Sequence, residues 1–404
     1  MLSTNAMRVF LLSTWFPHPP SNGSRIRAYN LLKGVAAHHE VSLISFVRDE
    51  EGQEPGDLHT LCTAIHTVPW IEFVPHRARA FLGYLSPLPR SVVDTYSAPM
   101  AQSVSEHLAR RRFDLVVALQ SPVARYIPVS GCWPSVLDEI EIGVFADAIR
   151  ISASPLRRAR AWLTWSKLCL YLKRLLARFD GCTVVSEGER VNLRRAVRGY
   201  ERVYVVPNGV DVEHHRMLSV APVSNTLVYT GALTYSANYD AVDYFLRDVL
   251  PIIQGEIADV RFTVTGSTAG VALERLPRRQ EVTFTGYVED IRPLVAGSWA
   301  LVVPLRIGGG TRLKILEAMA LGTPVVSTSK GAEGLDVTPE ENILIADTPR
   351  DFAAQTVRLL RDPALRRRLS ENGRRLVEDR YSWAEIGRRF NDLLESVVGQ
   401  RSQR

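Results

Sequence analysis

The chain has 404 residues, 46% of them apolar, and carries a formal net charge of +6. This length and composition exclude an intrinsically disordered chain and predict two domains, each with its own core. The excess of positive charge favours an anionic partner. Charge alone does not decide whether that partner is a nucleotide, a phospholipid or a nucleic acid.

Cysteine usage and the length of the apolar runs indicate the cellular compartment in which the protein is expected. No apolar run approaches the ~20 residues that span a bilayer, and no small-residue cleavage site follows the first run. We therefore expect a cytoplasmic protein without a signal peptide. The cysteines form no CxxC pair near histidines, which argues against a zinc site and a disulfide framework: Cys62, Cys132, Cys169 and Cys182.

The first half of the chain alternates short apolar runs with helical patterns. This rhythm predicts parallel strands joined by crossover helices, hence an α/β, doubly wound, Rossmann-like domain over residues 1–208. The runs are Val9–Ser13, Val41–Phe46, Asp114–Leu119, Cys182–Ser186 and Val203–Pro207.

A long loop, STWFPHPPSNGSRIRAYN, follows the first strand and opens a helix at about Ser24, which is predicted to cap it. Gly23 would let phosphate approach the backbone closely. Arg25 and Arg27 are candidates for a contact with phosphate or with a second substrate, or they are solvated arginines of a first turn. His18 is a further candidate, although a loop histidine without a visible partner is more often plain surface.

Two carboxylates follow a strand in the segment VLDEIEIG. Asp138 and Glu139 would lie at the carboxyl end of that strand, where one of them could position or deprotonate a substrate hydroxyl. A helix cap or a structural salt bridge is the alternative.

The segment 151–179 contains seven basic residues and no acidic one, and its tryptophans and leucines recur at helical spacing. This pattern suits an interfacial helix on the anionic inner face of a membrane. The alternative is a crossover helix whose apolar stripe faces the core.

After PNGVD at Pro207–Asp211 the strand rhythm restarts, which predicts a second α/β domain over residues 209–382. The terminal segment 383–404 is amphipathic and is expected to form a helix that packs back on the first domain. Open parallel sheets bind ligands at the carboxyl ends of their strands, so the loops after the strands are the expected sites.

Residues 300–328 read ALVVPLRIGGGTRLKILEAMALGTPVVST. A strand ends near Pro304, a glycine run follows, and Thr311 is predicted to cap a helix that ends at Leu321 before Gly322 and Pro324. The sequence therefore predicts strand, glycine loop, helix and strand.

The start of this helix favours an anion, because glycines allow close approach and free N–H groups point at the ligand. Arg312 and Lys314 oppose the helix dipole unless an anion is bound. We predict that both hold a diphosphate and that Glu317, on the same face as Lys314, accepts hydrogen bonds from ribose hydroxyls. The alternative is a capped surface helix with an ordinary Lys–Glu pair.

These residues resemble the retaining glycosyltransferases of family 4, which have the GT-B fold of two Rossmann-like domains. LEAMALGTPVVST is similar to the family's most recognisable stretch, and PNGVD to its usual entry into the second domain. The resemblance implies transfer of a sugar from a nucleotide-sugar donor to a lipid-linked sugar or saccharide acceptor in polysaccharide or glycolipid biosynthesis, with no cofactor and no metal.

By resemblance, Glu317 is the second carboxylate of the family's paired-glutamate motif, and Gly309 stands where the first is expected. GALTYSAN at Gly231–Asn238 lacks the family's diphosphate-clamping Arg and Lys, so Arg312, Lys314 and Arg306 would replace them. The loop Thr285–Asp290 would receive the nucleobase. Together, the predicted donor-binding residues are Gly23, Gly286, Val288, Arg306, Gly308, Gly309, Gly310, Thr311, Leu313 and Glu317. The acceptor-side candidates are His18, Arg25, Arg27 and Glu139, and the predicted catalytic residues are Arg312, Lys314 and Asp138.

Two other readings remain open: a sugar-nucleotide epimerase of similar fold and a non-catalytic nucleotide-sugar-binding protein. TGSTAG at Thr265–Gly270 lacks the spacing of a dinucleotide fingerprint. No recognition motif for nucleic acid accompanies the basic surface.

Overall fold

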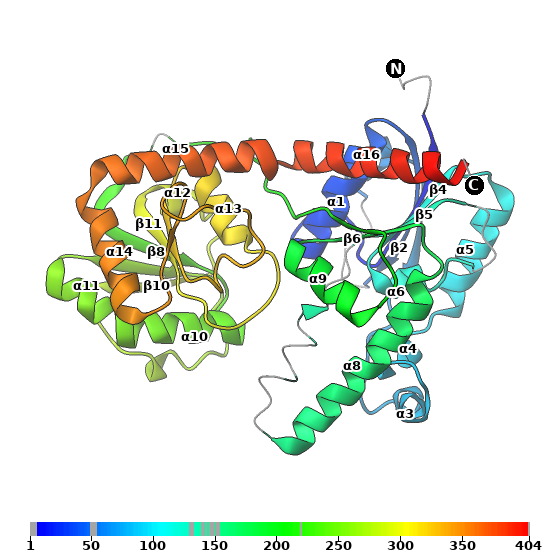
Figure 1. The fold of residues 1–404 in the computed structure, drawn as a ribbon, viewed down its shortest axis with the longest axis horizontal. Helices are drawn as coiled ribbons and strands as arrows, with labels where there is room; N and C mark the ends of the chain where they lie inside the picture. The colour runs from blue at the N-terminus through cyan, green and yellow to red at the C-terminus, as the bar shows by residue number, and fades with distance from the viewer. Residues whose placement is uncertain are drawn as a thin grey trace. The chain divides into compact units, whose positions relative to one another are not determined.

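The computed structural model describes residues 6–48, 55–128, 133–138, 142–143, 145, 149, 154–218 and 220–402. The chain forms two compact units (Figure 1). The first comprises Met1–Pro207 together with Ile386–Arg404, and the second comprises Asn208–Glu385.

The first unit is built on a seven-stranded parallel sheet with the strand order β3-β2-β1-β4-β5-β6-β7. The order reverses between β1 and β4, which confirms the predicted doubly wound topology. The strands are β1 (Arg8–Ser13), β2 (Glu40–Val47), β3 (Cys62–Pro69), β4 (Leu115–Leu119), β5 (Ser135–Asp138), β6 (Gly181–Val184) and β7 (Val203–Val205).

Helices connect these strands, and their apolar faces complete the core. They are α1 (Gly23–Ala36), α2 (Leu58–Leu61), α3 (Ala78–Leu85), α4 (Arg90–Asp94), α5 (Ala98–Arg110), α6 (Ser121–Ala124), α8 (Pro155–Leu176) and α9 (Glu187–Ala196).

The last helix, α16 (Trp383–Ser402), joins the first unit from Ile386 onward. Its Gly387 lies against Gly34 of α1, where a Cβ atom on Gly34 would meet the Cα of Gly387 at 3.0 Å. The Asn391 amide donates to the Gly34 carbonyl at 2.8 Å, and Arg401 pairs with Asp180 at 2.5 Å. Close backbone approach and an ion pair thus fix α16 on this unit (Figure 1).

The second unit is built on a six-stranded parallel sheet with the order β10-β9-β8-β11-β12-β13. Its strands are β8 (Val223–Thr230), β9 (Arg261–Thr265), β10 (Val282–Gly286), β11 (Ser298–Val303), β12 (Val325–Ser327) and β13 (Leu344–Ile345). Its helices are α10 (Ser236–Tyr244), α11 (Leu250–Glu256), α12 (Arg292–Ala296), α13 (Leu313–Ala320), α14 (Pro349–Arg361) and α15 (Pro363–Arg380), with a π-helical turn Phe245–Val249 and a 3₁₀ turn Leu273–Arg275.

Both predicted helix caps were wrong by one or two residues. Helix α1 is capped by Asn22, whose side-chain oxygen accepts from the Arg25 amide at 3.1 Å, so Ser24 lies inside the first turn. Helix α13 begins after Arg312, and the Thr311 hydroxyl instead accepts a hydrogen bond from the Asn208 amide at 2.7 Å. In the described part of the chain, no helix is long and apolar enough to cross a membrane.

Candidate functional site

The carboxyl ends of β8, β9 and β10 form a row of backbone without side chains. Gly231 follows β8, and its amide donates to the Thr265 carbonyl at 2.9 Å; Gly266 follows β9, and its amide donates to the Gly286 carbonyl at 2.9 Å. Both glycines have positive φ, and a Cβ atom on Gly266 would meet the Gly231 backbone at 2.4 Å. Only glycine fits there, and the row leaves backbone at the sheet edge where ligands bind.

The glycine loop between β11 and α13 is braced from inside by Arg312. This side chain is 5% exposed, and its guanidinium donates to the carbonyls of Gly309 at 2.9 Å, Gly308 at 3.0 Å and Lys330 at 3.2 Å. It also lies 3.8 Å from the Glu333 carboxylate. Because these donors face backbone carbonyls, Arg312 shapes the loop, and its predicted role as a diphosphate clamp stays a prediction.

Lys314 is the cation that reaches the row of glycines. Its ammonium lies 4.1 Å from the centroid of the Tyr229 ring and donates to Asn238 Oδ1 at 3.2 Å. A Cβ atom on Gly231 would lie 2.8 Å from the same nitrogen. Lys314 therefore starts on α13 and ends beside the carboxyl end of β8, where GALTYSAN supplies no cation of its own.

Burial shifts the protonation equilibria of the Lys314–Glu317 pair in opposite directions. Burial and, to a smaller extent, the nearby Arg312 charge lower the pKa of Lys314 to about 7, against the opposing effect of Glu317. Burial likewise raises the pKa of Glu317, and the Lys314 charge opposes that rise. The lowered pKa shows that the Lys314 ammonium is incompletely compensated, so a bound anion would stabilise its charged form.

Other predicted donor-side residues have different surroundings. The Arg306 guanidinium pairs with Asp240 at 2.6 Å and lies 4.5 Å from the centroid of the Tyr244 ring, and its predicted diphosphate contact stays a prediction. Gly286 ends β10 with a positive φ and open space where a Cβ would stand, and Val288 follows half-buried in the next loop.

In the first unit, Arg27 and Asp138 form a buried ion pair. Each side chain is 1% exposed, and the guanidinium donates to the carboxylate at 2.6 and 2.9 Å. Arg27 also donates to the carbonyls of Val206 and Pro207, while Asp138 accepts from the Thr183 hydroxyl at 2.5 Å. The pair joins α1 to the ends of β5, β6 and β7, which is the structural salt bridge expected as the alternative for Asp138. The substrate roles of Arg27 and Asp138 stay predictions.

The remaining first-unit candidates are not brought into one cluster. Arg25 is buried and donates to the Ser21 hydroxyl at 3.2 Å, and Gly23 begins α1 with open space around it. His18 lies against Gly56, with its Nδ1 3.9 Å from an Asp57 oxygen. Glu139 lies outside the described residues.

Sequence reasoning missed the residues that surround Lys314. Asn238 accepts from the Tyr229 hydroxyl at 2.7 Å as well as from Lys314, and it donates to the Ala232 carbonyl at 2.8 Å. The available signal was Asn238 itself, which lies in the first turn of the helix after β8, the first strand of the second unit. The resembling family often carries a cation in this segment.

Comparison with known proteins gives a family match within the second unit. Residues 224–362 match the family model described as glycosyl transferases group 1. A GDP-mannose-dependent monoacylated alpha-(1-6)-phosphatidylinositol monomannoside mannosyltransferase of Corynebacterium glutamicum is 24% identical over 249 residues, which cover 56% of this chain and 64% of that protein. The chain spans less than two thirds of the length of the curated relatives that it matches.

Solved structures extend the similarity to nearly the whole chain. Sucrose-phosphate synthase from Thermosynechococcus elongatus superposes with a TM-score of 0.68 at 19% identity, covering 98% of this chain and 100% of that one. HepE of Anabaena, solved with UDP and glucose, gives 0.64 at 17% identity, with 96% and 100% covered. These likenesses confirm the GT-B fold, and the family match places residues 224–362 among the group 1 glycosyltransferases.

Proposed function

We propose that the protein transfers a sugar from a nucleotide-sugar donor to a hydroxyl acceptor with retention of anomeric configuration, as a family 4 enzyme. The observation that carries the proposal is the place of Lys314, whose ammonium stands at the row of glycines ending β8 and β9, one helical turn from Glu317. A donor diphosphate would contact Lys314, and the donor ribose would contact the Glu317 carboxylate.

The proposed mechanism depends on stabilising the negative charge that develops on the leaving diphosphate. As the glycosidic bond to the diphosphate breaks, negative charge grows on the leaving oxygen, and Lys314 with the backbone amides at the start of α13 would stabilise it. With Asp138 committed to Arg27, we propose that a leaving-phosphate oxygen takes the acceptor proton during attack on the same face. This route requires no protein nucleophile.

Incubation with a panel of UDP-, GDP-, ADP- and dTDP-sugars tests the proposal. We expect slow release of one nucleoside diphosphate with free sugar when acceptor is omitted. Conversion of a donor into its epimer would identify the epimerase alternative. Binding of a nucleotide sugar without turnover, with every acceptor tried, would identify a binding protein.

The proposed neutralisation of the leaving group uses protein cations only. We expect turnover of the best donor in the panel to be unchanged by EDTA, and added Mg²⁺ or Mn²⁺ to have little effect. A loss of turnover in EDTA that divalent ions restore would show that this part of the proposal is wrong.

Donor affinity should depend on pH through Lys314. The pKa of Lys314 is lowered to about 7, so the ammonium is charged below that pH and loses its proton as the pH rises through it. Above about pH 7, affinity for the donor should fall, by up to tenfold per pH unit. Titration calorimetry between about pH 6 and pH 9 measures this, and Lys314→Met should give a weak, nearly flat profile. A flat profile in the wild type would contradict the assignment.

We also propose that the first unit contacts an anionic membrane through the surface formed by α3 and α8. The second half of α8 packs in the core, as the crossover-helix alternative expected, but Trp162 and Leu163 in its first half are 60% and 46% exposed. On α3, Leu82 and Leu85 are 61% and 90% exposed. Lys167 of α8 donates to the Gly83 carbonyl at 2.9 Å, which places the two helices side by side.

Flotation with vesicles tests this α3–α8 surface. Vesicles containing phosphatidylglycerol should recruit the protein, and neutral phosphatidylcholine vesicles should recruit less, because basic residues near an anionic surface each contribute ~1 kcal/mol. Trp162→Glu should weaken recruitment. Val191→Glu, at an exposed apolar position of α9, is the matched control. Equal recruitment of both variants would rule out this surface.

A further inference from the structure

A second candidate site lies wholly within the first unit. A cavity of about 320 Å³, in the size range of small-molecule pockets, opens beyond the carboxyl ends of three strands. Trp70 and Phe73 follow β3, Pro122 belongs to α6 after β4, and Ile142 and Phe145 follow β5. The carboxyl edge is where open parallel sheets bind ligands, so the cavity has the expected position of a substrate site.

Helix α8 closes the cavity with a mainly apolar wall. Leu168, Tyr171 and Leu172 line it, and Thr164 stands at an exposed position on the same helix. A neighbouring hollow of about 230 Å³ shares Thr164 and Phe73 with the cavity and is also lined by Leu163 and Tyr84. Because Leu163 and Tyr84 belong to the α3–α8 surface, this hollow, which Arg90, Arg160 and Lys167 also line, connects that surface with the cavity.

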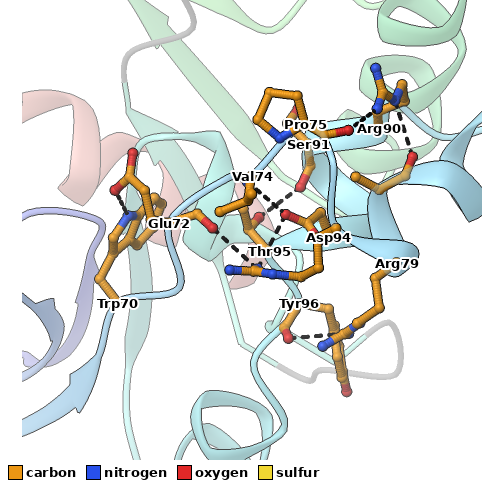
Figure 2. A network of polar contacts seen from close by, with 12 residues as sticks. Trp70, Glu72, Val74, Pro75, Arg79, Arg90, Ser91, Asp94, Thr95 and Tyr96 are labelled. Atoms are coloured by element: carbon orange, nitrogen blue, oxygen red, sulfur yellow. Dashed lines mark hydrogen bonds and ion pairs between the residues drawn. The ribbon is translucent and has the colours of Figure 1, made fainter.

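Polar contacts hold the segment after β3 in place (Figure 2). The buried Asp94 carboxylate accepts from the Val74 amide at 3.0 Å and pairs with Arg77 at 3.2 Å. Arg90 donates to the carbonyls of Pro75 at 2.6 Å and Ala80 at 3.0 Å. These bonds fix the segment after β3 against α4 and so hold the lining residues of this segment in position.

Two polar groups among the lining residues lack partners. Tyr171 is 8% exposed, and its buried hydroxyl makes no hydrogen bond within the described residues. The Nε of Arg125 is likewise buried without a partner, while its other nitrogens donate to the Val92 and Thr95 carbonyls and to the Tyr126 hydroxyl. A buried unpaired polar group is costly, so these two groups favour a ligand that brings a hydrogen-bond acceptor.

We infer that this cavity binds the hydrocarbon chain of a lipid-linked acceptor, with an anionic or hydroxylated end of the chain near Tyr171 and Arg125. The inference rests on the proposed function and names its acceptor class. The mainly apolar walls favour a hydrocarbon chain over a purely polar saccharide, and the connection to the α3–α8 surface gives a chain a route from a membrane. A prenyl chain and an acyl chain share this chemistry.

Binding of short, monomeric lipids tests the inference. Geranyl phosphate and dihexanoyl phosphatidic acid represent the prenyl and acyl sources, and inorganic phosphate is the control without a chain. Titration calorimetry on the full chain should show saturable binding of one of the two lipids and none of phosphate. Whichever lipid binds identifies the source.

A matched pair of variants locates the site. Thr164→Phe places a ring at the cavity, whereas Ser166→Phe places the same ring on the same helix outside the cavity lining. The two positions are alike, since each hydroxyl donates to the carbonyl four residues earlier, at 3.0 and 2.9 Å. Thr164→Phe should weaken lipid binding at least about tenfold, and Ser166→Phe should leave it unchanged.

The outcomes separate this inference from the proposed function. Absence of saturable binding of both lipids, or equal binding by the two variants, would overturn the cavity assignment. Nucleotide release from the donor panel, measured on the same preparations, stands independently of either result. Donor turnover without lipid binding would overturn only the inference. Lipid binding without donor turnover would overturn the glycosyl transfer, and with it the role of the lipid as acceptor, while the cavity would remain a lipid-binding site.

Discussion

Replacing Lys314 by methionine is expected to lower kcat/KM for the best donor by about 10- to 100-fold. The substitution keeps an unbranched side chain beside the Tyr229 ring and removes the ammonium that lies at the row of glycines. A charge-assisted hydrogen bond contributes ~1.5–3 kcal/mol, which corresponds to this range of rates. Initial rates of nucleotide release, measured against donor concentration, give the value.

Two companion variants sharpen the result. Glu317→Ala should also lower kcat/KM by about 10-fold or more, because the ribose would lose a charged acceptor. Lys173→Met, at an exposed position of α8 in the other unit, should turn over like the wild type. Wild-type rates for Lys314→Met and Glu317→Ala, with both variants folded, would show that the donor does not bind at Lys314 and Glu317.

Arg27→Met should destabilise the first unit by about 3–5 kcal/mol. The change leaves the Asp138 carboxylate, 1% exposed, without its ion-pair partner, and breaking a buried pair on one side costs this much. The carbonyls of Val206 and Pro207 lose their donor as well. Urea unfolding followed by circular dichroism should show an earlier transition for the first unit.

The double variant Arg27→Met/Asp138→Leu tests the physical cause. Removing both charges leaves no uncompensated carboxylate, so it should recover part of the loss, and the coupling energy of the double-mutant cycle should be favourable. Additive losses from the two single changes would mean that the pair contributes nothing as a pair. A stable Arg27→Met protein would contradict its buried role altogether.

The sequence predicted the fold best where strands are buried on both faces. β1 and β4 are apolar and buried almost throughout, which is the pattern of a central parallel strand. β3 was missed because it is an edge strand: most of its residues are exposed or half-buried, and His66 and Thr67 interrupt its apolar run. Edge strands carry a weaker hydrophobic pattern because only part of their surface meets the core.

The candidate site was predictable only in part, for a related reason. A local pattern identified Glu317 and Lys314 on one face of α13, since helical spacing fixes neighbours within a turn. It could not show that Arg312 turns inward to three carbonyls, or that Asp138 meets Arg27, 111 residues away in the sequence. Those partners come from chain topology, and the same topology brings Asn238 of α10 to the Lys314 ammonium.

A crystal structure of the full chain with its nucleotide-sugar donor tests the central claim most directly. Our account predicts diphosphate oxygens within hydrogen-bond distance of Lys314 Nζ and of the first amides of α13, with ribose hydroxyls on Glu317. It also predicts that Arg312 keeps its contacts with the carbonyls of Gly308 and Gly309. A donor whose diphosphate lies away from Lys314, or is held by Arg306 instead, would contradict it.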